Sequence, residues 1–237
     1  MTTQSIAYAE LRPSIKNGDV VLFRGKGFVS GVILSVQSLG YMLYPKNWKR
    51  GFTKGVWALW SHVGTVVRVP YSMVIDLLAQ KKLPKGVIVA RREEGKDDIV
   101  LLFESTSING GFRGVQLRLL SDALKSYMGK VSYRRLITGW NSDIEQKDRE
   151  FIEATLGRNY ERQIIELARS AFKIRDQKAN DKYYFCSELC AGRFQYWGIL
   201  PMNPPANEHA PEDFRTGGIV ERRLINAKLE REITVTI

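Results

Sequence analysis

The sequence predicts an α+β fold, because its strand-like segments come first and its helix-like segments follow them. The clearest strands are short apolar runs rich in β-branched residues, at Val20–Phe23, His62–Val69 and Ile99–Glu104. Later in the chain the apolar residues recur at helical spacing instead. The helices expected from this spacing lie at 143–156, 162–174 and 184–197.

Further elements are expected between these segments. Short strands are predicted at Gly114–Leu119 and Val131–Ile137. The run 87–90 is predicted to form a hairpin with the strand that follows it. Residues 72–82 are predicted to be helical. The uncharged stretch 27–44 carries apolar residues at helical spacing, but it is too polar and too short for a confident membrane span, so we expect a core helix there.

Composition indicates a single domain over residues 1–237. The chain is 44% hydrophobic, enough for a substantial core, and no Pro-, Ser- or Gly-rich run divides it. Its net charge of +11 suits an anionic membrane surface or a polyanionic cell wall. Nucleic-acid binding is disfavoured because no recognition motif accompanies the charge. The sequence does not predict the oligomeric state.

Cysteine content points to a reducing compartment. The chain has only Cys186 and Cys190, which is not a disulfide framework. The N-terminal residues lack the pattern of a secretory signal, so a cytoplasmic location is expected. Zinc binding is disfavoured because a Cys-x3-Cys spacing without a second ligand pair is unlike known zinc sites.

Cys186 is the candidate nucleophile. It stands at the predicted start of the third helix, where unpaired backbone N–H groups and the helix dipole favour a thiolate. We therefore expect Cys186 in an exposed first turn and Cys190, one turn deeper, in the core. The alternative is that Cys186 is also a buried apolar residue, which is the commoner role of a free cysteine.

Nucleophilic catalysis also needs a base and a polar group that orients it. His62 begins a strand and is the preferred base, whereas His209 lies in a proline-bracketed loop and is expected to be exposed. Glu104 ends a strand, so an antiparallel pairing would bring it to the same sheet edge as His62. Asp19, at another strand start, is the competing carboxylate. Either histidine and either carboxylate could instead be structural.

Several segments, taken in order, resemble the permuted NlpC-type papain-like cysteine amidase and peptidase superfamily, in its YiiX-like group related to lecithin:retinol acyltransferase. The matching segments are Gly18–Phe23, Trp60–Val67, Phe103–Thr106, Gly114–Val115 and Tyr184–Leu189. The histidine precedes the cysteine, which is the permuted order.

The resemblance implies a core at about 17–205, an insertion at about 70–98 and a tail at about 206–237. It implies an antiparallel barrel-like sheet followed by helices, with the catalytic Cys186 at a helix N-terminus. It also implies a place for Tyr184 near the nucleophile, as a substrate or oxyanion contact, although this tyrosine could equally pack in the core.

The expected function is that of a cysteine hydrolase or acyltransferase acting on an amide or ester through Cys186, His62 and Glu104, with no metal or organic cofactor. The substrate is expected to be a cell-wall peptide or an N-acyl or lipid molecule. Basic and aromatic residues alternate in the segment 44–60, which we expect to border the site. The alternative is that this segment is a surface loop whose aromatic residues pack on the barrel. The alternatives are a non-catalytic binding module on the same fold and a basic nucleic-acid-binding protein.

Overall fold

The computed structural model describes residues 5–25, 59–72, 87–88, 97–106, 113–160 and 183–237. The predicted helices at 27–44 and 162–174, nearly all of the one at 72–82, and most of the segment 44–60 lie outside the described residues. For the rest of the chain, the elements can be compared with those expected from the sequence.

The strands are β1 (Ser5–Ala7), β2 (Val20–Gly25), β3 (His62–Pro70), β4 (Val87–Ile88), β5 (Asp98–Thr106), β6 (Gly114–Leu119), β7 (Gly129–Arg134), β8 (Leu136–Thr138), β9 (Asn159–Tyr160), β10 (Tyr183–Tyr184), β11 (Ala227–Leu229) and β12 (Ile233–Thr236). The α-helices are α1 (Tyr8–Leu11), α5 (Leu120–Ser126), α6 (Ser142–Thr155), α8 (Cys186–Tyr196) and α9 (Ile219–Arg223). Short 3-10 helices are η1 (Arg12–Ser14), η2 (Ala206–Glu208) and η3 (Pro211–Phe214).

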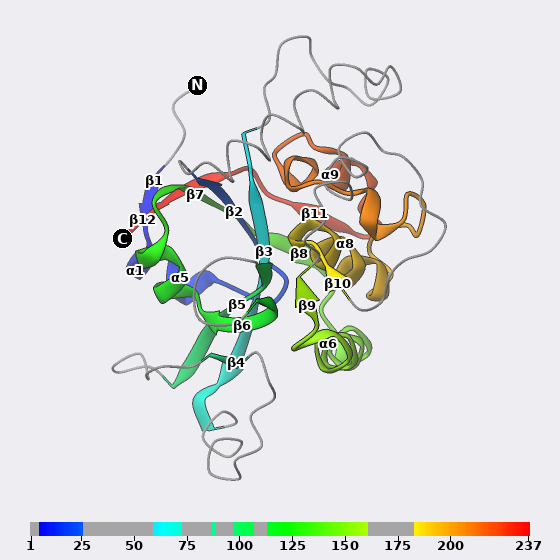
Figure 1. The fold of residues 1–237 in the computed structure, drawn as a ribbon, viewed down its shortest axis with the longest axis horizontal. Coiled ribbons are helices and arrows are strands. Elements are labelled where there is room, and N and C mark those ends of the chain that lie inside the picture. Colours follow the sequence, from blue (N-terminus) through cyan, green and yellow to red (C-terminus); the bar gives the residue numbers. More distant parts are fainter. Residues whose placement is uncertain (1–4, 26–58, 73–86, 89–96, 107–112, 161–182) are drawn as a thin grey trace.

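A mixed sheet organises the fold, as expected for an α+β protein. Its strand order is β1-β12-β7-β2-β3-β5-β6-β9-β10, with β4 beside β6. The pairs from β12 through β9 are antiparallel, whereas β1 with β12, β9 with β10 and β4 with β6 are parallel. The strands curve around one another in Figure 1. This strand order is an open path among the described residues rather than a closed ring.

Two sequence-based expectations about the sheet differ from the structure. The strand at 87–88 does not form a hairpin with β5; it pairs in parallel with β6, Val87 opposite Leu117. Residues 206–237 are more than a tail. The strand β12 pairs with β7 and β1, and β11 pairs with β8. Phe214, Val220 and Leu229 from this segment lie in the main core.

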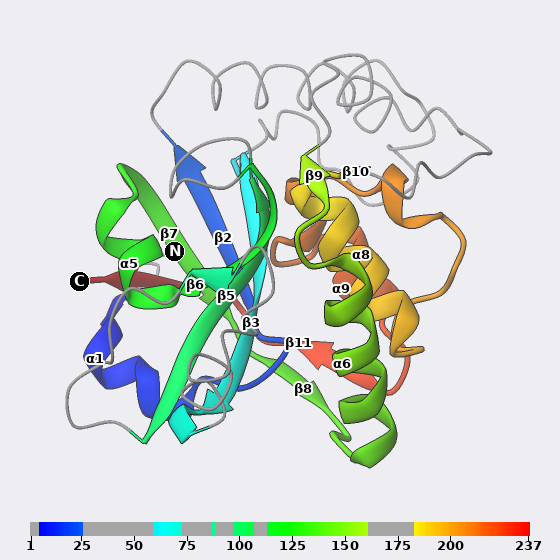
Figure 2. The same ribbon diagram turned by 60° about the horizontal axis from the view of Figure 1, so that its bottom comes forward.

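Helices cover both faces of the sheet. Figure 2 shows α6, α8 and α9 on one side and α1 and α5 on the other. Alternate residues of β2 face these two layers: Val20 and Leu22 pack with α8, whereas Val21 and Phe23 pack with α1 and α5. This alternation explains why β2 reads as a continuous apolar run.

Buried charge fixes α8 against the sheet. The Arg193 guanidinium donates from Nη1 to the Thr65 hydroxyl, 2.7 Å away, and to the Val66 carbonyl of β3, 3.1 Å away. It also pairs with Asp148 of α6. The guanidinium of Arg193 thus links α8, α6 and β3. These contacts fix the position of the N-terminus of α8 relative to the start of β3.

Candidate active site

His62 and Glu104 lie side by side at one edge of the sheet, as expected for residues on antiparallel strands. The strands β3 and β5 are antiparallel, with Thr65 opposite Phe103, so the start of one strand lies beside the end of the other. The two side chains contact each other along a diagonal of the ladder. His62 Nε2 lies 2.6 Å from Glu104 Oε2.

The second carboxylate oxygen of Glu104 is held by two side chains of β6. Gln116 stands directly opposite Glu104 in the sheet, and its Nε2 donates to Oε1 at 2.9 Å. Arg118, two residues further on the same face, brings its Nε to 3.2 Å from the same oxygen. Sequence analysis missed both residues. The alternation of polar and apolar residues in β6 places the two on one face of the strand, but it does not indicate that this face meets Glu104.

Cys186 is the first residue of α8 and lies against His62. Cys186 lies near enough to His62 to raise its pKa, and Nδ1 is the ring nitrogen that does not face Glu104. The structure corrects one expectation: the first turn is not exposed, since Cys186 is only 6% exposed and belongs to the core cluster with Trp60 and Val63. Cys190 is fully buried, as expected.

Electrostatics in the cluster favour a protonated imidazole. Burial by itself lowers the pKa of His62, but the charges and hydrogen bonds of Cys186 and Glu104 outweigh it and raise the pKa to about 10. Burial raises the pKa of Glu104, whereas His62, Arg118 and Gln116 lower it to a value below the ordinary one. Glu104 is therefore ionised at neutral pH and faces an imidazolium.

The N-terminal turn of α8 is held by contacts from its own residues. The Glu188 carboxylate accepts a hydrogen bond from the Phe185 backbone N–H at 3.3 Å, and the Ser187 hydroxyl donates to the His209 carbonyl at 2.7 Å. The backbone N–H groups of the first turn have no acceptor within the helix. They lie next to the sulfur of Cys186 and can receive a negatively charged oxygen.

The other candidate histidine and carboxylate lie elsewhere. His209 was expected to be exposed, but it is 1% exposed and stacks edge-on against Phe214, so the proline-rich loop packs into the core. Asp19 accepts hydrogen bonds from the Tyr133 hydroxyl and from the Leu136 backbone N–H, and burial raises its pKa to about 6. Asp19, directly before β2, is thus a structural carboxylate.

A further buried carboxylate positions the chain just before His62. Glu212 Oε2 accepts hydrogen bonds from the backbone N–H groups of Leu59, at 2.7 Å, and Trp60, at 3.1 Å. Its other oxygen lies 2.9 Å from Arg215 Nε. Glu212 was not recognised in the sequence, because its partners are backbone groups about 150 residues away that leave no pattern.

Two expectations about the surroundings of the site stay predictions. The side chain of Tyr184 lies outside the described residues, and so do residues 44–58 of the basic and aromatic segment. Within the described ranges, no group of three or more His, Cys, Asp and Glu side chains is arranged to hold a metal ion. No described helix is both long enough and apolar enough to span a membrane.

No protein-family model matches the sequence, and no curated protein matches it. Among solved structures, the chain is similar to the crystal structure of metalloprotein YiiX from Escherichia coli O157:H7, with a TM-score of 0.42 and 14% sequence identity. The similarity covers 94% of this chain and 97% of that chain.

Proposed function

We propose that the protein is a cysteine hydrolase or acyltransferase that cleaves an amide or ester bond. The observation that carries the proposal is the position of His62, held between the Glu104 carboxylate and the thiol of Cys186. A thiol, a base that contacts it and a carboxylate that orients the base are the groups that covalent acyl chemistry requires.

In the proposed reaction the proton of Cys186 has already passed to His62 before the substrate binds, and the sulfur attacks the carbonyl carbon of the substrate. The carbonyl π electrons move to oxygen, which becomes an oxyanion. When the tetrahedral intermediate collapses, the bond to the amine or alcohol breaks, and His62 gives its proton to that leaving group. Water or another acceptor then attacks the thioester and gives its proton to His62, and when the second tetrahedral intermediate collapses the Cys186 sulfur departs with its electron pair.

Glu104 and the first turn of α8 have separate roles in this scheme. Glu104 fixes the ring orientation and stabilises the imidazolium, and Gln116 and Arg118 in turn hold Glu104. The backbone N–H groups of Cys186 and Ser187, at the start of α8, stabilise the oxyanion. Cell-wall peptides, N-acyl compounds and lipid esters are all substrates that this chemistry accommodates.

The test is labelling with a thiol-directed acyl electrophile followed by peptide mapping. A single acyl adduct on Cys186 that is lost in Cys186→Ser and slowed in His62→Gln supports the proposal. Equal labelling of Cys186 in the native protein and in His62→Gln contradicts it. Circular dichroism of each variant checks that the fold is retained.

A second candidate is a binding module that does not turn over a substrate. The specific observation in its favour is the 6% exposure of Cys186, since most buried free cysteines only pack. This candidate predicts no acyl adduct at Cys186 with any electrophile in the folded protein. The same labelling experiment therefore separates the two.

A further inference from the structure

A pocket lies far from the cysteine, at the other end of β3 and α8. Its volume is about 510 Å³, which falls in the range of about 300–1,000 Å³ typical of small-molecule sites. Arg68 of β3 and Trp140 line it. Arg68 is six residues beyond His62, or about 20 Å along the strand. Trp140 packs edge-on against Trp197, the residue that ends α8.

The lining divides into a cationic part and an apolar part. Lys16, Arg68 and Arg135 supply the positive charge, and no carboxylate is among the lining residues. Leu136, Ile137 and Trp140 supply apolar surface, and Ile137 is 47% exposed. Such a pocket matches a ligand that has a negative charge at one end and an apolar group at the other.

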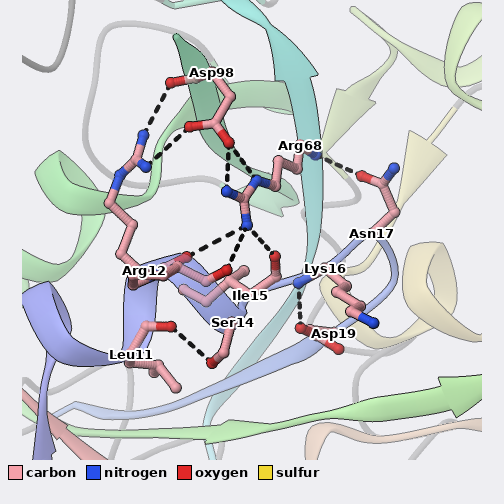
Figure 3. Close-up of polar contacts among 10 residues, drawn as sticks. Leu11, Arg12, Ser14, Ile15, Lys16, Asn17, Asp19, Arg68 and Asp98 are labelled. Carbon is pink, nitrogen blue, oxygen red and sulfur yellow. Dashed lines mark hydrogen bonds and ion pairs between the residues drawn. The ribbon is translucent and has the colours of Figure 1, made fainter. Parts of the chain in front are cut away.

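The carboxylates nearest to the pocket are engaged by other groups (Figure 3). Asp98 is bound by both Arg12 and Arg68. Asp19 accepts hydrogen bonds from the Tyr133 hydroxyl and from the backbone N–H groups of Lys16 and Leu136. These two carboxylates are therefore bound by groups of the protein itself and do not face a ligand in the pocket.

Arg68 is rigid and serves as part of the wall. Its Nε and Nη2 contact Asp98, and its Nη1 donates to the Ile15 carbonyl at 2.7 Å and the Pro13 carbonyl at 3.1 Å. Asn17 accepts a hydrogen bond from the Arg68 backbone N–H through Oδ1, which leaves its Nδ2 as a donor (Figure 3). The wall therefore presents a rigid guanidinium, whose charge Asp98 offsets, and an amide donor.

Lys16 and Arg135 are the cations with spare donors. Lys16 is exposed and makes no side-chain ion pair with the described residues. A side-chain hydrogen bond with Tyr133, together with the charges of Asp19 and Glu230, raises the pKa of Arg135, so only part of its guanidinium is left for a ligand. Its Nη2 reaches the Ser14 carbonyl only at 3.4 Å, and its buried Nε has no hydrogen-bond partner in the described part of the chain. A buried donor without a partner is uncommon and favours an acceptor ligand.

We propose that this pocket binds a small organic anion, with a phosphate or carboxylate head against Lys16, Asn17 and Arg135 and an aromatic or short aliphatic group against Ile137 and Trp140. The site is separate from the Cys186 cluster, and it does not depend on the proposed acyl chemistry. Because the pocket is open and built from β7–β8 and the loop before β2, ligand entry needs no movement at His62.

Calorimetric titration with phenyl phosphate, phenol and benzylamine tests the proposal. We expect phenyl phosphate to bind saturably, and phenol and benzylamine to bind at least about tenfold more weakly, because each lacks the charge that the donors recognise. Inorganic phosphate should also bind more weakly than phenyl phosphate. Equal affinity for benzylamine, or no saturable binding of phenyl phosphate, overturns the proposal.

Two variants and one control locate the binding. Lys16→Gln should weaken phenyl phosphate binding about tenfold, since one charged hydrogen bond is lost. Ile137→Ser should weaken phenyl phosphate but leave inorganic phosphate unchanged. Lys130→Gln, an equally exposed lysine outside the pocket, should change neither. Protein alkylated at Cys186 should bind normally. Equal effects of Lys16→Gln and Lys130→Gln, or loss of binding on alkylation, contradict the proposal.

Discussion

Arg193 of α8 and Asp148 of α6 form a bidentate ion pair, with Nε 2.7 Å from Oδ1 and Nη2 2.9 Å from Oδ2. The side chain of Arg193 is fully buried and that of Asp148 is 8% exposed. The same guanidinium donates to Thr65 and Val66 of β3. The placement of Cys186, at the start of α8, beside His62, at the start of β3, therefore depends on Arg193, which joins the last turn of α8 to Asp148 and to the middle of β3.

Replacing Asp148 by Ala should destabilise the protein strongly. The change leaves the Arg193 charge buried with one partner gone, which typically costs about 3–5 kcal/mol. Urea unfolding followed by tryptophan fluorescence measures the loss. Lys147→Ala on the same helix breaks an exposed pair with Asp143 and should cost less than about 0.5 kcal/mol. Similar losses of unfolding free energy in both variants would show that the buried pair contributes no more to stability than the exposed pair.

Alkylation should distinguish the two cysteines. Brief treatment with iodoacetamide at neutral pH should modify Cys186 and spare Cys190, because Cys190 is fully buried and burial raises its pKa well above the ordinary value. Peptide mass spectrometry gives the ratio of modified Cys186 to modified Cys190. Cys190→Ala should leave the rate unchanged, whereas His62→Gln should slow it. Preferential labelling of Cys190 in the folded protein would remove Cys186 as the nucleophile.

The charge of Glu104 should control the titration of His62. In Glu104→Gln the imidazolium loses its carboxylate, so the pKa of His62 should fall from about 10 toward the ordinary value of 6.5. Acyl turnover should fall by about 10- to 100-fold. Proton NMR can follow the titration, with His209 as the reference in the same spectrum. An unchanged His62 titration would mean that Glu104 does not stabilise the charged ring.

Arg118 should act on the site through Glu104. It is one of the groups that lower the pKa of Glu104, so Arg118→Gln should raise this pKa and move the acid limb of the turnover profile to higher pH. Arg118 Nη2 also donates to the Ser126 hydroxyl at 3.3 Å. Ser126→Ala removes that second contact and should not move the profile. A loss of turnover at every pH with an unshifted limb would indicate a structural role only.

The proximity of His62 and Glu104 could be predicted because it needs only two facts, that His62 begins one strand while Glu104 lies near the end of another, and that neighbouring strands are antiparallel. Gln116 and Arg118 could not be predicted to contact Glu104 because their contact depends on the register of β5 against β6. That register is set by packing and by the connection between the strands, not by a local pattern.

The burial of Cys186 and the structure of the segment 206–237 were not predicted, and both result from contacts between residues far apart in the sequence. Cys186 is buried because Trp60 and Val63, far away in the sequence, pack over it. The C-terminal segment joins the sheet because β12 pairs with β1 from the opposite end of the chain, Ser5 opposite Thr234. Neither contact leaves a periodic signal in its own segment. Local sequence patterns therefore predicted an exposed Cys186 and a C-terminal tail at 206–237.

Glu212 gives the last prediction, which concerns pH. Burial raises its pKa from 4.5 to about 7, although the backbone N–H groups of Leu59 and Trp60 and the Arg215 charge oppose this rise. The folded protein therefore keeps a proton that the unfolded chain releases between these two values. The corresponding stability is fully present below about pH 4.5 and is lost as the pH rises through about 7.

Glu212→Gln cannot titrate, and its amide oxygen can still accept from Leu59 or Trp60. The variant should therefore gain stability relative to the native protein between pH 5 and pH 8, by on the order of 1–3 kcal/mol. Urea unfolding at both pH values measures the difference, and the titration of Asp19 cancels because both proteins contain it. Glu153→Gln, an exposed site on α6, should show no such change. If Glu212→Gln instead loses more stability at pH 8 than at pH 5, then Arg215 and the two N–H groups outweigh burial, and the carboxylate anchors Leu59 and Trp60 in its charged form.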